Sequence, residues 1–559
     1  MRNPKKNKKM KKFINKYFVG ACVLSMSLAA TSCSEDYLDT LPTDSVGAGE
    51  AVGTTENAAK AINGIAEIMK TQQGYFGQGF CGENNIISQY ENYCSQDYLY
   101  NGLASGWSVI MNQSWHDRTS SIYLSYAWYY YYTIIGGANS IIANIDNATG
   151  TDAEKAFIKA QALTYRAYGY EKLLHYYAVR WKDSNNGSAD GVVLRLDETT
   201  GDIPMSTQLE VYNQIYADCK EAISLFEQSG MDREEGKVWF TNKNVAHAVY
   251  ARAALNREDY STALTQAKLA REGYPLMSNA EYAAGFANPT SEWIMGSYGG
   301  EDENMWYWTY GTMFACNGYY TTRYTYGAGA ISRELAAKIP NEDFRKSLFV
   351  TEDKFPAYDM NDPANQDQSF GFIGVSGAGK LTSEVAYEAW DYIAEHSASG
   401  FSEAYSTGYV PLGSHLKFWV YGMPGISHLP FIRSSEMVLI EAEANYFLGK
   451  EADAIASLIE LNATSGRNPN YTCDKSGNDL FEEIVAYRGF ELWGEGFQWS
   501  DFKRWKRASV RTAISKGGSA HTAIAITIEP EDALNWTWQI PLNESDFNKG
   551  LSYGPEVEE

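Results

Sequence analysis

Residues 488–505 read RGFELWGEGFQWSDFKRW, and this stretch carries the most specific pattern in the chain. It holds three acidic, three basic and three tryptophan residues, so charges of both signs are interleaved with large apolar rings. A charged side chain packed among such rings needs a partner of opposite sign, because burying an unpaired charge is costly. The stretch therefore predicts a partly buried, salt-bridged helical region whose carboxylates are structural and not catalytic.

Shorter motifs stand on both sides of this stretch. In chain order they are ALTYRAY at 162–168, PFIR at 430–433 leading through Glu436 to AEA at 442–444, and QIPLNE at 539–544. This ordered set resembles the SusD/RagB family. The stretch at 488–505 is similar to the family signature RxxELxGEGxRxxDLxRW.

The resemblance covers nearly the whole chain after its leader and departs from the family at two places. Gln498 stands where the signature usually has Arg, and residues 177–181 read YAVRW where the family usually has Phe-Gly-x-Val-Pro. The second departure affects a local turn and not the family assignment. The resemblance implies a mostly helical fold with four tetratricopeptide-like helix pairs. It also implies a binding protein, not an enzyme, that lies as a lid over a SusC-like TonB-dependent outer-membrane transporter and captures oligosaccharides or, in some members, peptides.

Hydrophobic periodicity separately predicts a mostly α protein. Apolar residues recur at helical spacing over residues 54–70, 121–145, 153–177, 209–228, 241–255, 261–273, 434–448 and 451–463. Ala251 with Ala263, and Ala442 with Ala454, repeat one twelve-residue offset at which a tetratricopeptide unit needs small side chains between paired helices. We therefore expect a tetratricopeptide-like helical-repeat scaffold.

Between these helices, residues 278–431 are rich in glycine and aromatic residues and show few helical periods. Long irregular stretches on a rigid frame usually carry function. We expect one SusD-like nutrient-binding domain over residues 33–559. It would consist of an N-terminal helical part (33–277), a loop-rich insert (278–431) and a C-terminal part with the signature (432–559).

Residues 1–32 have the features of a lipoprotein signal peptide. A basic head precedes an apolar run at 17–30 that is too short to span a bilayer comfortably, and small residues then lead to Cys33. Cys33 is the expected lipid-attachment residue, and Glu35 and Asp36 resemble the acidic tag that directs Bacteroidetes lipoproteins to the cell surface. Ala30 stands where Leu is usual, so an ordinary signal peptide with an incidental cysteine stays open as the alternative. We expect a lipid-anchored outer-membrane protein that faces outward.

Charge and residue spacing argue against several kinds of ligand. With 46 basic and 69 acidic residues the net charge is −23, and loss of the eight basic residues of the leader makes it −31, which disfavours nucleic acid. The cysteines form no CxxC motif and no two histidines stand at metal-ligand spacing, so no metal site is expected from these residues. The acidic run at 301–304 (EDEN) is expected to be a solvated loop, with calcium binding open as the alternative. Residues 374–381 (GVSGAGKL) place Leu381 where a phosphate-binding P-loop needs a hydroxyl, so no nucleotide or other cofactor is expected.

The chain contains 41 tyrosines and 15 tryptophans, whose flat faces and polar edges suit sugar rings. The WYYYY stretch at 128–132 lies in a helical pattern and is expected to pack the helix. Two loop-like clusters that contain glycines are better candidates for glycan binding, with Asn101 and Arg323 donating directional hydrogen bonds to hydroxyl groups. The candidates are Tyr98, Tyr100, Asn101 and Trp107 in the first cluster, and Trp306, Trp308, Tyr310, Tyr320, Arg323 and Tyr324 in the second. For each residue the alternative is a loop aromatic that packs on the frame.

Two further functions stay open from the sequence. A surface glycoside hydrolase would need two carboxyl groups flanking a groove, typically about 5 to 10 Å apart, and no acid/base motif stands out. A peptide-capturing member of the same family would use the same pocket for backbone amides and aromatic side chains.

Overall fold

The computed structural model describes residues 52–551 apart from several gaps. The gaps are residues 73–75, 77–79, 100–107, 117, 287, 299–314, 316–328, 352–371, 375–391, 393–394, 396–408, 412, 414 and 420–427. The described residues belong to one compact unit, Val52–Glu559. The predicted leader and Cys33 lie outside them.

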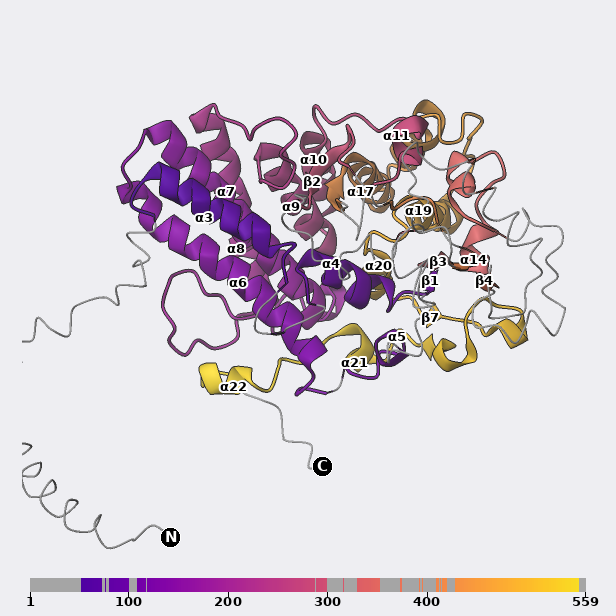
Figure 1. The fold of residues 1–559 in the computed structure, drawn as a ribbon, viewed down its shortest axis with the longest axis horizontal. Coiled ribbons are helices and arrows are strands. Elements are labelled where there is room, and N and C mark those ends of the chain that lie inside the picture. The colour runs from indigo at the N-terminus through magenta and orange to yellow at the C-terminus, as the bar shows by residue number, and fades with distance from the viewer. Residues whose placement is uncertain are drawn as a thin grey trace, which may run out of the picture. The chain divides into compact units, whose positions relative to one another are not determined.

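A stack of antiparallel helices forms the frame (Figure 1). Its helices are α3 (Thr55–Ile68), α6 (Ile122–Asn144), α7 (Asp152–Tyr177), α8 (Gln208–Ser229), α9 (Lys243–Asn256), α10 (Tyr260–Ala270), α17 (Ser434–Phe447), α18 (Glu451–Ile459) and α19 (Gly477–Glu491). α7 packs between α6 and α8, and α9 packs between α8 and α10. α17 then lies beside α10 although the irregular region separates the two in sequence. Successive helices therefore pack as in a helical repeat, and the predicted mostly α, tetratricopeptide-like fold is confirmed.

Small residues allow the close helix contacts that the sequence predicted. Ala251 and Ala263 are fully buried where α9 meets α10, and Ala442 and Ala454 are fully buried where α17 meets α18. Capping boxes at Thr151 and Thr207 explain why α7 and α8 begin where they do, since each side chain accepts a backbone N–H that the helix cannot satisfy.

The last predicted helix differs in its final turn. α18 ends at Ile459 and a π-helical turn, η11 (Glu460–Thr464), completes the predicted 451–463 range. This wider turn directs the Asn462 side chain inward, where its amide donates to Leu458 O at 2.8 Å and its oxygen accepts from Arg345. The hydrophobic period predicts the helix but carries no signal for the π turn.

The strands are short and pair in twos, each pair antiparallel. They are β1 (Tyr98–Leu99) with β3 (Ala330–Ile331), β2 (Trp293–Gly296) with β6 (Pro430–Arg433), β4 (Phe372–Gly374) with β5 (Tyr409–Pro411), and β7 (Ser509–Val510) with β8 (Thr527–Ile528). Because β2 and β6 lie near the two ends of the predicted insert 278–431, their pairing fixes both ends of the insert at one place on the frame.

Shorter helical elements complete the described chain. They are α4 (Glu83–Asn85), η2 (Ile86–Asn92), α5 (Ser108–Met111), η4 (Ile145–Asn147), η5 (Trp181–Asp183), α11 (Asn279–Ala283), α14 (Arg333–Ala336), η7 (Phe344–Leu348), α20 (Gln498–Trp505), η12 (Ile514–Lys516), η13 (Thr522–Ile524), α21 (Ala533–Trp536) and α22 (Glu544–Phe547). Within the described ranges, no helix combines the length and the apolar character needed to cross a membrane.

Candidate functional site

The 488–505 stretch folds as the end of α19, a tight turn and α20. Gly494 and Gly496 adopt positive φ angles of 78° and 80° in this turn. A Cβ on Gly496 would lie 3.1 Å from the Ile87 side chain and 3.2 Å from the Ile87 backbone, so glycine lets the turn run against η2. The turn places Glu491 and Glu495 inside the protein, where they are 0% and 4% exposed.

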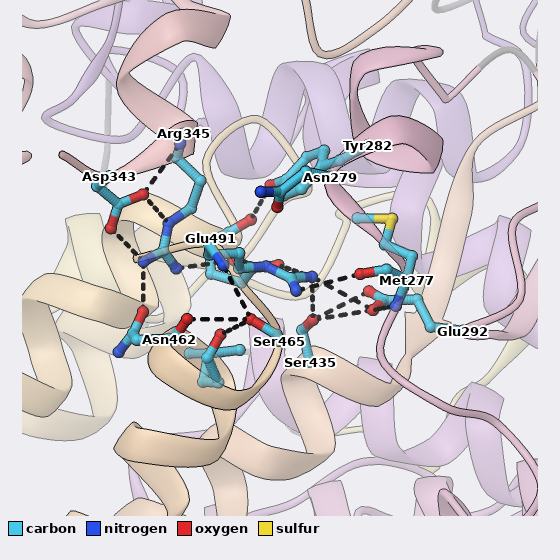
Figure 2. A network of polar contacts seen from close by, with 12 residues as sticks. Met277, Asn279, Tyr282, Glu292, Asp343, Arg345, Ser435, Asn462, Ser465 and Glu491 are labelled. Atoms are coloured by element: carbon cyan, nitrogen blue, oxygen red, sulfur yellow. Dashed lines mark hydrogen bonds and ion pairs between the residues drawn. The ribbon is translucent and has the colours of Figure 1, made fainter. Parts of the chain in front are cut away.

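Glu491 lies at the centre of a buried network of ion pairs (Figure 2). Its carboxylate accepts from Arg345 Nη1 at 2.8 Å, Arg433 Nη1 at 2.7 Å and Arg467 Nε at 3.0 Å. The network has four cationic and four anionic members, so its charge is balanced. They are Arg345, Lys417, Arg433 and Arg467 with Glu292, Asp343, Glu491 and Glu495.

The network gives the signature carboxylates a structural role. Burial by itself would raise the pKa of Glu491, but Arg467, Arg433 and Arg345 hold it well below its usual value. A carboxyl group that stays ionised in this way cannot serve as a proton donor. Its arginine partners come from η7, β6 and the turn after η11, so one side chain of α19 ties three segments that are distant in sequence to this helix.

A second set of ion pairs joins α20 to α17. Asp501 accepts from Arg488 Nε at 2.5 Å and from Arg504 Nε at 2.8 Å, and Arg504 also pairs with Glu443 on α17. Asp501 and Arg488 are each 4% exposed. The predicted buried, salt-bridged helical region is confirmed in both sets.

A cleft of about 330 Å³ opens beside α19 and α20, and we call it the signature cleft. Its lining includes Asp97, Tyr98, Leu335, Arg488, Trp493 and Gln498. The rings of Tyr98 and Trp493 stack with their centroids 4.9 Å apart, and Trp493 Nε1 donates to Asp97 O at 2.8 Å. Tyr98, which was predicted from the first aromatic cluster, is thus only 2% exposed and forms part of the cleft wall.

Asp97 is a buried carboxylate held by neutral donors. It accepts from Gln498 Nε2 at 2.6 Å and from the Ser332 hydroxyl, and burial raises its pKa despite these bonds. The sequence reasoning did not connect Asp97 with this site. The signal that could have pointed to Asp97 was Gln498, which departs from the family signature. A neutral residue at a usually basic position indicates that its hydrogen-bonding partner has changed.

The β1–β3 pair brings together the borders of both predicted aromatic clusters. Leu99, which immediately precedes segment 100–107, pairs with Ala330, and Tyr98 pairs with Ile331. A Cβ on Gly329 would lie 2.0 Å from the Tyr98 hydroxyl, so glycine is needed where the chain returns from segment 316–328. The first candidate segment therefore begins, and the second ends, at the same short ladder.

Other ends of the irregular region meet at this ladder. Ile331 N donates to Gly413 O at 2.9 Å, and Gly413 N donates to Val350 O at 2.7 Å. Nine of the predicted glycan-binding residues lie outside the described residues. They are Tyr100, Asn101, Trp107, Trp306, Trp308, Tyr310, Tyr320, Arg323 and Tyr324.

Among the described residues, no group of three His, Cys, Asp or Glu side chains is arranged to hold a metal ion. The cysteines of this part of the chain, Cys81, Cys94, Cys219 and Cys473, are free thiols. The described part of the site thus consists of aromatic faces, paired charges and hydrogen-bonding groups. Such an arrangement suits non-covalent binding of a ligand through stacking and hydrogen bonds.

Two family models match successive parts of the chain. The model described as "Starch-binding associating with outer membrane" matches residues 37–255, and the model described as "SusD family" matches residues 274–553. The second match alone spans half of the chain. A search of curated proteins finds no match.

The fold is similar to solved structures from Bacteroides. A SusD-like carbohydrate binding protein from Bacteroides vulgatus has a TM-score of 0.64 at 22% identity, covering 89% of this chain and 97% of its own. A SusD superfamily protein from the same species gives 0.67 at 19%, covering 90% and 100%. A SusD superfamily protein from Bacteroides thetaiotaomicron gives 0.63 at 19%, also covering 90% and 100%. At these identities the likeness establishes a shared fold.

Proposed function

The chain belongs to the SusD family, and from that premise we propose that it is a surface lipoprotein that binds a glycan for uptake across the outer membrane. The observation that carries the proposal is the pairing of β1 with β3. It supports one combined binding face, because the two candidate aromatic segments border the same ladder. The match to a starch-binding, outer-membrane-associated family model supports the ligand class and the location.

Aromatic residues in the two segments would form the platform of this face. A flat ring covers the C–H face of a sugar, and polar groups beside it select the hydroxyl pattern. We assign the stacking role to Trp107, Trp306 and Trp308, and the hydrogen-bonding role to Asn101 and Arg323. Tyr98 would anchor the platform to the frame, since its ring stacks on the Trp493 ring with the centroids 4.9 Å apart.

In this proposal the protein binds a glycan and does not catalyse a reaction on it. The carboxylates of the signature are paired with arginines, and the pKa values of both Glu491 and Asp501 lie below their usual values because these guanidinium groups outweigh the effect of burial. A glycosidase needs a carboxyl group that is protonated at working pH. These two residues therefore do not supply the acid.

Membrane attachment and transfer complete the proposal. Residues 1–32 would be removed as a signal peptide, Cys33 would carry the lipid, and the folded part would pass its oligosaccharide to a SusC-like TonB-dependent transporter. A family member that captures peptides is the alternative, because aromatic faces and hydrogen-bonding groups also suit peptide backbones.

Affinity electrophoresis tests the proposal with soluble protein that begins after Cys33. Gels would contain amylopectin, galactomannan, xyloglucan or arabinan, and we expect at least one polysaccharide to retard the protein. A parallel assay for new reducing ends should stay at background. Retardation by none of the gels, or turnover that is lost on changing one carboxylate, would overturn the proposal.

A further inference from the structure

A second groove lies between α6, residues 195–200 and α22. Figure 1 shows α22 at the lower left of the view and the β1–β3 pair at the right. Its volume is about 650 Å³, and we call it the α6–α22 groove. Tyr129 and Tyr132 on α6 and Phe547 on α22 contribute aromatic rings to its lining. Phe547 is 65% exposed, and its ring meets Tyr129 edge to face with centroids 6.4 Å apart.

The groove explains part of the WYYYY stretch at 128–132. Trp128, Tyr130 and Tyr131 are at most 1% exposed, which confirms the prediction that the stretch packs the helix. Tyr129 and Tyr132 are only partly buried and line the groove. Residues three apart lie on one face of a helix, so their two rings stand one above the other along the groove wall.

Gly136 keeps the next turn of this wall open. It lines the groove in the middle of α6, and a Cβ built on it would meet no atom within 4 Å. Its neighbour Gly137 faces Ile65 at 3.3 Å from such a Cβ and so has a packing reason to be small. A helix-interior glycine without a packing reason lowers helix stability by about 1 kcal/mol relative to alanine. At Gly136 the missing side chain therefore costs helix stability but leaves space in the groove.

The charged groups of the groove limit what it can bind. Its lining contains four carboxylates and a single guanidinium group. These are Asp197, Glu198, Glu544 and Asp546, with Arg195. An excess of carboxylates repels acidic sugars such as uronates and sulfated residues, while carboxylate oxygens accept hydrogen bonds from neutral hydroxyl groups.

We propose that the α6–α22 groove is a second contact site for a neutral oligosaccharide, with Phe547 and Tyr129 as its stacking faces. This inference rests on the proposed function, because the groove would bind a further part of the same glycan chain. A site of 650 Å³ lies within the range of small-ligand pockets. Two separate contacts on one long chain raise the overall affinity without a new kind of interaction.

Two variants test the groove from opposite directions. Phe547→Ala removes an exposed stacking face, and Gly136→Leu fills the space without a backbone clash. We expect each to weaken retardation in the neutral gel that retards the parent, by about threefold to tenfold in affinity, which is the range for one aromatic contact. Polygalacturonate should retard the parent less than that neutral polysaccharide.

Gly64→Leu provides the matched control. Gly64 also lies inside a helix, α3, and an added Cβ there meets no atom within 4 Å, but it does not line the groove. This variant should bind as the parent does. If Phe547→Ala and Gly136→Leu both bind as tightly as the parent, or if polygalacturonate is preferred, the groove proposal is wrong although the parent still binds. If no polysaccharide retards the parent, the proposed function fails and the groove proposal with it.

Discussion

Gln498 and Asp97 exchange two hydrogen bonds across 401 residues of sequence. Asp97 N donates to Gln498 Oε1 at 2.8 Å, and Gln498 Nε2 donates to the Asp97 carboxylate at 2.6 Å. Asp97 directly precedes β1, so this pair fastens the edge of the proposed glycan face to the start of α20. Because Gln498 is neutral, it donates a hydrogen bond to the buried Asp97 carboxylate but does not neutralise its charge.

Replacing Gln498 tests this pair. Gln498→Leu leaves the buried Asp97 N–H without its acceptor and removes the 2.6 Å donor from the Asp97 carboxylate. We expect the free energy of unfolding to fall by about 2 to 3 kcal/mol. Gln498→Arg supplies a charge and should lower the pKa of Asp97. In the parent the raised pKa makes stability decrease as pH rises from the ordinary value through the folded one, so Gln498→Arg should reduce that decrease. Urea denaturation at several pH values measures both effects; equal stability of Gln498→Leu and parent would contradict the first.

Glu491→Gln tests the central ion network. The change removes the charge that three arginines share, and uncompensated buried guanidinium groups should destabilise the fold by about 3 to 5 kcal/mol. Glu482→Gln is the control, since Glu482 pairs with Arg507 near the surface, where the two side chains are 47% and 27% exposed. Exposed pairs contribute less than about 1 kcal/mol. Guanidinium chloride denaturation of both variants measures the loss in free energy of unfolding. Similar losses in the two would show that the buried network contributes no more to stability than a pair near the surface.

The contrast between these two sites shows what the sequence could predict. Interleaved charges and tryptophans at 488–505 indicate buried ion pairs, because burying the tryptophans brings neighbouring charges inside, where they need partners. The partners Arg345 and Arg467 carry no such signal, since they follow irregular segments and reach Glu491 only through the tertiary fold. The helices could be predicted because a helix depends on local periodicity in the sequence. The arginine partners could not, because a long-range ion pair depends on the packed structure.

The candidate site shows the same limit. Tyr98 belongs to a predicted aromatic cluster, but β1 extends over only two residues and turns its ring onto Trp493. Such short ladders have too few residues to show an alternating pattern. The α6–α22 groove was also beyond prediction, because Tyr129 and Phe547 meet from distant parts of the chain. Their contact depends on where the last short helix docks.

His116 should make the protein sensitive to acid. Burial lowers its pKa to about 3, and its Nδ1 lies 3.1 Å from Asn535 O, to which it donates. The folded pKa lies below the unfolded value of about 6.5, so this contribution to stability is present above pH 6.5 and is lost as pH falls toward 3. His116→Phe keeps a ring among the surrounding tryptophans and removes the titration. Thermal unfolding between pH 7 and 4 should show a smaller fall in Tm for the variant, and parallel curves would contradict the assignment.

Trp308→Ala and Trp107→Ala test the two aromatic segments as one glycan face. Each removes one proposed stacking ring, and we expect a loss of affinity of about tenfold in the gel that retards the parent. Phe447→Ala is the control, because Phe447 is an exposed aromatic residue, 42% accessible, on α17 of the frame. It should leave binding unchanged. If both tryptophan variants bind as the parent does, the glycan site lies elsewhere.

Cys33→Ser tests the proposed anchor, since a hydroxyl cannot form the thioether that would hold the diacylglyceryl group. Acylated protein should disappear when cells are labelled with an alkyne-tagged fatty acid, and protease added to intact cells should no longer reach the protein at the surface. Cys22→Ser is the matched control, because Cys22 lies inside the apolar run of the leader and should leave with it. Several acyl chains are needed for stable attachment, so loss of the whole lipid group should release the chain and not merely weaken its hold. Labelling that persists in Cys33→Ser, or that depends on Cys22, would place the lipid elsewhere and remove the basis for a surface-bound glycan receptor.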